Sequence, residues 1–157
     1  MKNTAPDSSR AEANSPLHLV LDTNTVLALW MFRDPVLDGL RRWIESTRPS
    51  LFAREDTLAE LAAVLGYAHF GQTGSAQAAL LAGYRDRVHC LPTSATEVAL
   101  PACKDPDDQK FLELAWQANA SHLLTRDRAL LAMARKREIR DRFRILSPES
   151  FSALHAL

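Results

Sequence analysis

Acidic residues recur in this sequence at places where they could hold a metal ion beside a reacting group. Asp22 directly follows the apolar run HLVL, and Asp127 follows SHLLT by two residues. Asp107 and Asp108 open the segment DDQKFLELA, and Glu60 lies within TLAELAAVL. Carboxylates that share a site repel one another unless one is protonated or a cation is present. Because Mg²⁺ and Mn²⁺ prefer oxygen ligands, converging acids would predict a site for one of these ions.

Each acid also has a simpler structural interpretation. Asp is a good N-cap residue, so Asp22 could merely cap the helix predicted after it. The other acids have comparable alternatives: Asp107 and Asp127 as helix caps, Asp105 in an Asp-Pro turn, and Glu60 as a solvated helix residue. The sequence favours a common site only if the elements bring these acids together.

The elements that must position the acids alternate between strands and helices. Short apolar runs predict strands at 17–21, 50–53, 88–92, 121–125 and 143–146. Helical spacing and proline breaks predict helices at 25–32, 36–46, 56–65, 72–87, 107–118 and 128–137, with a last one capped by Ser147 and Pro148. This order predicts a three-layer α/β/α sandwich with a mostly parallel central sheet. Ligands of such sheets bind beyond the carboxyl ends of the strands, where these acids would lie.

Length and composition suit one globular domain. Of the 157 residues, 46% are hydrophobic and 24% charged, and we expect a single domain over 17–157 after a disordered polar lead at 1–16. The lead has no apolar segment of a secretory signal, and no run of about 18 apolar residues predicts a membrane span. Cys90 and Cys103 lack metal-ligand spacing, so we expect two small buried side chains and a cytoplasmic protein.

Charge is unevenly distributed although the net charge is zero. Between Arg126 and Arg144 there are eight basic residues and three acidic ones, a local excess of five positive charges. Such a stretch could attract phosphates, or it could be a solvated helical face.

Four segments together resemble PIN-domain ribonucleases, and especially the PIN toxins of bacterial toxin–antitoxin pairs. They are VLDTNTVLALW, TLAELAAVL, DPDDQKFLELAWQANASHLLTRDRALL and RILSPESF, of which the third is the most specific. The resemblance implies metal-binding and catalytic acids at Asp22, Glu60, Asp108 and Asp127, with Asn24 and Thr125 as supporting polar residues. Asp108 rather than Asp107 matches because it precedes Ala115 by seven residues, the usual spacing in the family. Ala129 departs from the family, which often has an acid there, but that position is not a core ligand.

This resemblance implies hydrolysis of RNA phosphodiester bonds with Mg²⁺ or Mn²⁺. It also implies a toxin role and an antitoxin partner, and it allows a homodimer. Arg126 and Arg128 flank Asp127 and could hold the RNA backbone. No Gly-rich phosphate loop is present, so we expect no nucleotide cofactor. The chemistry needs none of the five histidines, which we expect in surface or core roles.

Three alternatives stay open from the sequence. The chain could be a stand-alone RNA-processing PIN nuclease instead of a toxin. A haloacid-dehalogenase-type phosphatase would need a second Asp two residues after the first, where this chain has Asn24. A non-catalytic binding module with an acidic pocket would share the cleft but not the hydrolysis.

Overall fold

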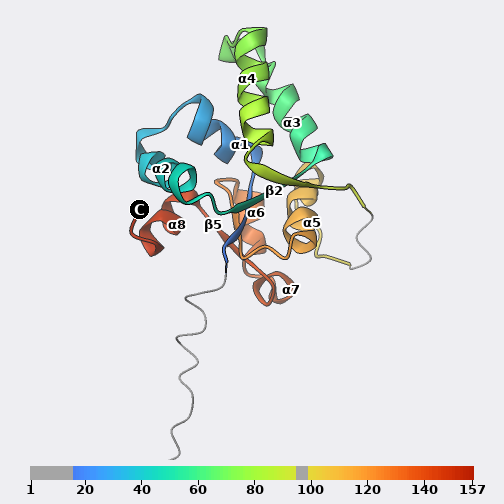
Figure 1. Cartoon of the computed structure of the whole chain (residues 1–157). Helices are drawn as coiled ribbons and strands as arrows, with labels where there is room; N and C mark the ends of the chain where they lie inside the picture. Colours follow the sequence, from blue (N-terminus) through green and yellow to red (C-terminus); the bar gives the residue numbers. More distant parts are fainter. Residues whose placement is uncertain (1–15, 95–98) are drawn as a thin grey trace, which may run out of the picture.

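The computed structural model describes residues 16–94 and 99–157. Within these ranges, five strands form one parallel sheet in the order β3-β2-β1-β4-β5 (Figure 1). They are β1 His18–Leu21, β2 Ser50–Arg54, β3 Val88–Leu91, β4 His122–Leu124 and β5 Arg144–Leu146. Every strand end lies within one residue of its predicted position, and the predicted α/β architecture is confirmed. The predicted lead at 1–16 lies almost wholly outside the described residues.

Helices connect and cover the strands. They are α1 Thr23–Val26, α2 Asp38–Thr47, α3 Glu55–Leu65, α4 Gly74–Arg85, α5 Gln109–Gln117, α6 Arg128–Met133, α7 Arg137–Arg140 and α8 Pro148–Leu154. Shorter 3-10 helices occur at Pro35–Leu37, Ala68–Phe70 and Pro106–Asp108. In the part of the chain that the structure describes, no helix has the length and apolar character needed to cross a membrane.

The first helix differs from its predicted span of 25–32. It begins at Thr23, because the Asp22 side chain accepts the Thr25 N–H and caps it. The chain then continues as a π-helical segment, Leu27–Met31, in which the Phe32 N–H donates to the Leu27 carbonyl. Pro35 begins the next 3-10 helix and does not end this one.

The helix predicted at 128–137 is too long, because α6 ends at Met133 and a second short helix, α7, begins at Arg137. Lys136 has φ −70° and ψ 128°, outside the helical region, and separates α6 from α7. The bend allows Ile139 of α7 to become fully buried, whereas most of the charged residues around it stay exposed. Burial of this apolar side chain therefore decides the local structure against helix propensity.

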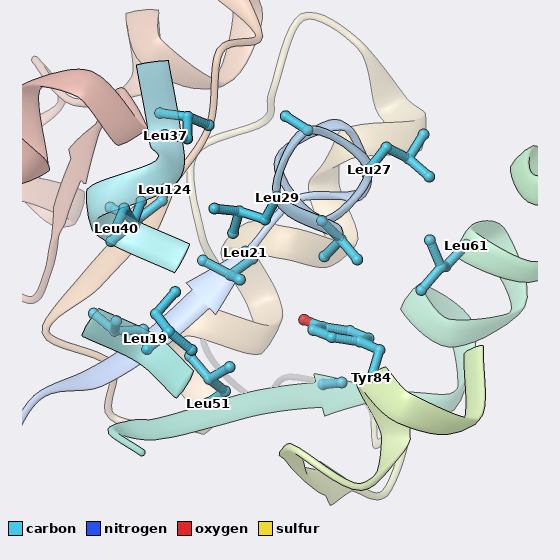
Figure 2. Packing of buried hydrophobic residues seen from close by; sticks show 14 of the residues in the cluster. Leu19, Leu21, Leu27, Leu29, Leu37, Leu40, Leu51, Leu61, Tyr84 and Leu124 are labelled. Atoms are coloured by element: carbon cyan, nitrogen blue, oxygen red, sulfur yellow. The ribbon is translucent and has the colours of Figure 1, made fainter. Parts of the chain in front are cut away.

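Two cores pack on the two faces of the sheet. Side chains alternate along a strand, so Leu19 and Leu21 of β1 face one core and Val20 faces the other. The first core lies under α1 to α4 and α8; Figure 2 shows its leucines around the buried Tyr84 of α4. The second lies under α5, α6 and α7. The predicted three layers are thus confirmed, with β1 at the centre.

The two cysteines differ in burial. Cys103 is buried, as predicted. Cys90 is exposed, which contradicts the prediction, because it lies on the edge strand β3 and its thiol contacts the exposed Glu55 carboxylate at 3.3 Å.

Candidate active site

Asp22 stands at the carboxyl end of the central strand β1 and is 4% exposed. Its Oδ1 accepts the Thr25 N–H at 2.8 Å, and its Oδ2 accepts a hydrogen bond from the Thr125 hydroxyl. Burial raises the pKa of this carboxyl, while the hydrogen bonds from Thr125 and Thr25 oppose the rise. The simpler interpretation of Asp22 as an N-cap is correct, and it does not exclude a second role in a site.

Thr125 connects Asp22 to Asp127. It is fully buried after β4, donates to Asp22, and accepts the Asp127 N–H at 2.9 Å. The Asp127 carboxylate in turn caps α6, accepting the N–H groups of Ala129 and Leu130 at 2.8 and 3.0 Å. A single hydroxyl therefore fixes the backbone of one acid and the carboxylate of another. Through these two hydrogen bonds Thr125 contacts both acids that the resemblance implied it would support.

Glu60 reaches the same region from α3. Its Oε1 accepts the Thr23 hydroxyl at 2.6 Å, and its Oε2 forms an ion pair with Lys110 of α5. The carboxylate side chain is 28% exposed, so it is not simply a solvated helix residue. Lys110 also donates to the Asp107 carbonyl. Sequence reasoning missed Lys110, although its position two residues after Asp108 could have indicated a positive charge among the acids.

Asp108 ends the 3-10 helix that leads into α5, where it is partly buried. Burial, followed by repulsion from Asp127, Asp105, Glu60 and Asp22, raises its pKa to about 7. The neighbouring acids differ from their predicted roles in one respect. Asp105 caps this 3-10 helix by accepting the Asp107 N–H at 3.0 Å, so Asp107 is not the cap. The cap lies one turn earlier because the helix opens with Pro106, before the α-helical part.

All four expected acids line one cleft of about 420 Å³ at the carboxyl edge of the sheet. Its other lining residues are Thr23, Asn24, Val64, Tyr67, Asp107, Lys110 and Phe111. Five carboxylates face one ammonium group there, a formal excess of four negative charges when all are ionised. The exposed Asn24 belongs to this wall, and none of the five histidines does. The tertiary structure thus brings together residues that are separated by more than 100 positions.

The donor set fits a hard cation. Every acidic side chain of the cleft offers oxygen, and repulsion from neighbouring acids adds to the effect of burial in raising the pKa of Asp108. Over the described ranges 16–94 and 99–157, however, no group of three or more Asp, Glu, His or Cys side chains is arranged to hold a metal ion. Glu60 is engaged by Lys110, and Asp22 and Asp127 each use an oxygen in a helix cap. Binding of a cation would therefore require side-chain movement.

A buried ion-pair network lies behind the cleft and was not predicted. Arg54 ends β2, and its side chain is 2% exposed. Its Nε donates to Asp56 of α3 at 3.0 Å, and a terminal nitrogen donates to Glu113 of α5 at 3.1 Å. The contacts join the two helices that carry Glu60 and Lys110. An arginine at the end of an otherwise apolar strand, followed by Asp56, was the available sequence signal.

The two arginines flanking Asp127 have different environments. Arg126 pairs with Asp34 at 2.8 Å and also donates to Glu149 of α8 at 2.7 Å. Arg128 is exposed and forms no ion pair within the described residues. Neither side chain lines the acidic cleft. Arg126 is thus held by the protein's own carboxylates, whereas Arg128 faces solvent.

Comparison with known sequences agrees with this arrangement. A sequence model of a family described as "PIN domain" matches residues 18–129, more than two thirds of the chain. The match runs from β1 to the start of α6 and includes all four acids. A comparison with curated proteins finds no match.

Proposed function

The chain belongs to the PIN-domain family, and on that premise we propose that it is a metal-dependent endoribonuclease. Family membership supports a nuclease in general. The proposal of RNA hydrolysis at this site rests mainly on one observation: Asp22, Glu60, Asp108 and Asp127 reach a single cleft from separate elements. Repulsion between these like charges lowers the stability of the fold. Such an arrangement is typical of a functional site, where the charges themselves are needed.

Asp22, Glu60, Asp108 and Asp127 would hold Mg²⁺ or Mn²⁺. When bound, such an ion activates and orients water and neutralises charge on the leaving oxygen of a phosphodiester. The protein's own contribution is to fix the acids: Thr125 holds the Asp22 carboxylate, and the α6 N-terminus holds that of Asp127. These contacts place Asp22 and Asp127 at the cleft, whereas Glu60 would have to leave its ion pair with Lys110 to reach a cation.

Two further residues of the wall suit an RNA phosphate. Among the described lining residues Lys110 supplies an ammonium group, which would have to leave its ion pair with Glu60, and the exposed Asn24 supplies an amide that can donate a hydrogen bond. Of the two arginines predicted to hold RNA, Arg128 is the better supported. Its guanidinium is exposed and has no ion-pair partner among the described residues, whereas Arg126 already binds two carboxylates. Both remain proposals as RNA contacts.

The decisive experiment measures cleavage and metal binding in the same proteins. We expect the wild type to cleave single-stranded RNA with Mg²⁺ or Mn²⁺, and a chelator to stop it. Asp22→Asn should abolish cleavage and reduce the rise in melting temperature that Mn²⁺ causes. Glu138→Gln, at an exposed acid of α7, removes one negative charge away from the cleft and serves as the control. Equal Mn²⁺ shifts in wild type and Asp22→Asn would contradict the site, and absence of cleavage would favour a binding module.

The adjacent acids 107 and 108 provide a matched pair of variants. Asp108→Asn should raise the stability of the metal-free protein, because it removes the partly buried charge that the other acids repel. It should also abolish cleavage, whereas Asp107→Asn, at an exposed side chain, should retain most of it. Thermal melts and cleavage rates test both expectations. If Asp107→Asn abolished cleavage and Asp108→Asn did not, the assignment within the pair would be reversed.

We also propose a toxin role with an antitoxin partner, supported by the resemblance of the four segments to PIN toxins. Expression in bacteria should then arrest growth, and a small DNA-binding protein encoded beside it should restore growth. A stand-alone processing nuclease, the alternative, would cause no arrest that a neighbouring gene relieves. Gel filtration would show whether the chain forms the homodimer that the resemblance allows.

A further inference from the structure

A cluster of four aromatic rings, three of them exposed, adjoins the acidic cleft through Tyr67. It consists of Phe32 at the end of the π-helical segment and Tyr67, His69 and Phe70 between α3 and α4; we call these four residues the aromatic platform. Phe32 is 58% exposed, Tyr67 is 50% exposed and His69 is exposed, whereas Phe70 is partly buried against the first core. Single exposed apolar residues are common, but adjoining exposed rings usually mark an interaction site.

The rings of the platform contact one another. Phe70 lies at the centre, with centroids 5.5 Å from Phe32, 6.1 Å from Tyr67 and 4.3 Å from His69. The Tyr67 and Phe70 rings are nearly parallel, at 22°. Tyr67 precedes the short 3-10 helix that carries His69 and Phe70, and this helix ends at Gly71, whose φ of +62° glycine adopts without a steric cost. The backbone therefore holds three of the four rings on one short, sharply terminated segment.

Tyr67 joins the platform to the candidate active site, because its side chain belongs both to the ring cluster and to the wall of the acidic cleft. A strand of RNA with a phosphate at the acids would have its neighbouring nucleotides along that wall. The cleft carries excess negative charge, so it cannot attract the RNA backbone by charge alone. Stacking of bases on aromatic rings supplies binding energy without requiring positive charge.

We propose that the aromatic platform, through Tyr67, stacks an unpaired nucleobase next to the phosphate that is cleaved. This inference rests on the proposed ribonuclease function and adds a base-stacking residue for the single-stranded RNA proposed above, since a base inside a duplex cannot present its face to a side chain. The stacking would be tolerant of base identity, because every base has a π-face. Because the platform is continuous with the cleft through Tyr67, a base is favoured over a protein partner as the group that binds there.

The test measures the affinity of a short single-stranded RNA for protein in which Asp22→Asn blocks cleavage. In this background Tyr67→Ala should weaken binding about fivefold to a hundredfold, the range for loss of one base–aromatic stack. Tyr67→Phe keeps the ring and should stay within about twofold. The salt dependence of binding should be the same in all three proteins, because no phosphate contact is lost. Melting temperatures establish that each variant is folded.

An RNA with one abasic position, moved along the strand, separates stacking from a general effect. One position should weaken binding to Tyr67-containing protein, and the same position should have little further effect on Tyr67→Ala. Equal losses in both proteins, or unchanged affinity on Tyr67→Ala, would overturn the stacking site while leaving the nuclease proposal intact. A change of oligomeric state in Tyr67→Ala or Phe32→Ala without a change in RNA affinity would overturn it in favour of a protein interface. Absence of RNA binding in the Asp22→Asn background, together with absence of cleavage by the wild type, would remove both proposals.

Discussion

At the scale of single residues, Thr125 shows how one buried hydroxyl organises two acids. It donates to Asp22 and accepts from the Asp127 backbone, so both acids depend on its position. Without this hydroxyl, the buried Asp22 carboxylate would keep its desolvation cost with only the hydrogen bond from the Thr25 N–H to offset it. We therefore propose Thr125 as a positioning residue for the candidate site.

We expect Thr125→Val, which keeps the shape but removes the hydroxyl, to destabilise the protein by about 1–3 kcal/mol. It should also weaken Mn²⁺ binding, because Asp22 is no longer held. Thr125→Ser retains the hydroxyl and should preserve metal affinity, with a smaller loss of stability from the missing methyl group. Urea unfolding and Mn²⁺ titration provide the two measurements. If the valine and serine variants bound Mn²⁺ equally well, the hydroxyl would have no positioning role.

At the scale of elements, the Arg54 network connects the end of β2 to α3 and α5. Asp56 raises the pKa of the Arg54 guanidinium, burial opposes this, and Glu113 adds to the rise. The arginine is nearly inaccessible, whereas the side chains of both carboxylates are about one third exposed. Desolvation therefore costs free energy mainly at the Arg54 guanidinium. Neutralising the two carboxylates and removing the arginine should then lower stability by different amounts.

We expect the double variant Asp56→Asn, Glu113→Gln to cost about 3–5 kcal/mol, because it leaves a buried guanidinium without a counter-charge. Arg54→Met should cost less, since the carboxylates it leaves behind remain partly hydrated. Urea unfolding of both variants gives the comparison. A larger loss in Arg54→Met would mean that packing of the arginine stem, and not its charge, holds the helices together.

Several basic residues of the stretch from 126 to 144 contact acidic or aromatic side chains of the protein. Arg126 joins the end of β4 to α8, Arg137 pairs with Asp141 on α7, and Arg142 lies 4.2 Å from the Trp116 ring centroid. Several of these positive charges thus already face another group of the same protein. The excess of positive charge in the sequence therefore overstates the charge that is free to bind RNA.

At the scale of the whole molecule, pH should affect stability through a histidine outside the cleft. His122 of β4 is 9% exposed and packs against Phe151 and His155 of α8. Burial, with further repulsion from His155 and Arg144, lowers its pKa to about 4. Its ring nitrogen Nδ1 lies 3.0 Å from the Ser121 hydroxyl. The fold therefore holds a neutral imidazole.

Because the pKa of His122 is lower in the folded chain than in the unfolded one, the unfolded chain binds the proton more readily. The stability contributed by the neutral imidazole is complete above about pH 6.5 and is lost as the pH falls towards 4. We expect the free energy of unfolding to fall by about 2 kcal/mol from this group between pH 7 and pH 5. Urea unfolding at both pH values should show a smaller fall in His122→Gln. His89→Gln, at an exposed imidazole of β3, is the control and should behave as the wild type.

The alternation of strands and helices was predictable because it depends on local patterns. Apolar runs of four or five residues and proline breaks located all five strands within one residue at each end. This alternation predicted a parallel sheet, and the parallel sheet predicted the edge at which Asp22 and Asp127 come together. The identity of the acids was available from the resemblance of their segments to a family. Local signals were weaker where tertiary burial competed with them: the helix predicted to reach residue 137 ends at Met133, and the short helix that follows buries Ile139.

The tertiary structure alone decided which charged side chains that are far apart in the sequence form ion pairs. Lys110 pairs with Glu60 across 50 residues, Arg54 with Glu113 across 59, and Arg126 with Asp34 across 92. Long charged side chains have many rotamers and many possible partners, so sequence spacing does not select among them. The aromatic platform depends likewise on the approach of Phe32 to the segment after α3. Local residue patterns could thus determine the strands and the placement of the acids, but the pairing of remote side chains required the packed arrangement of the helices.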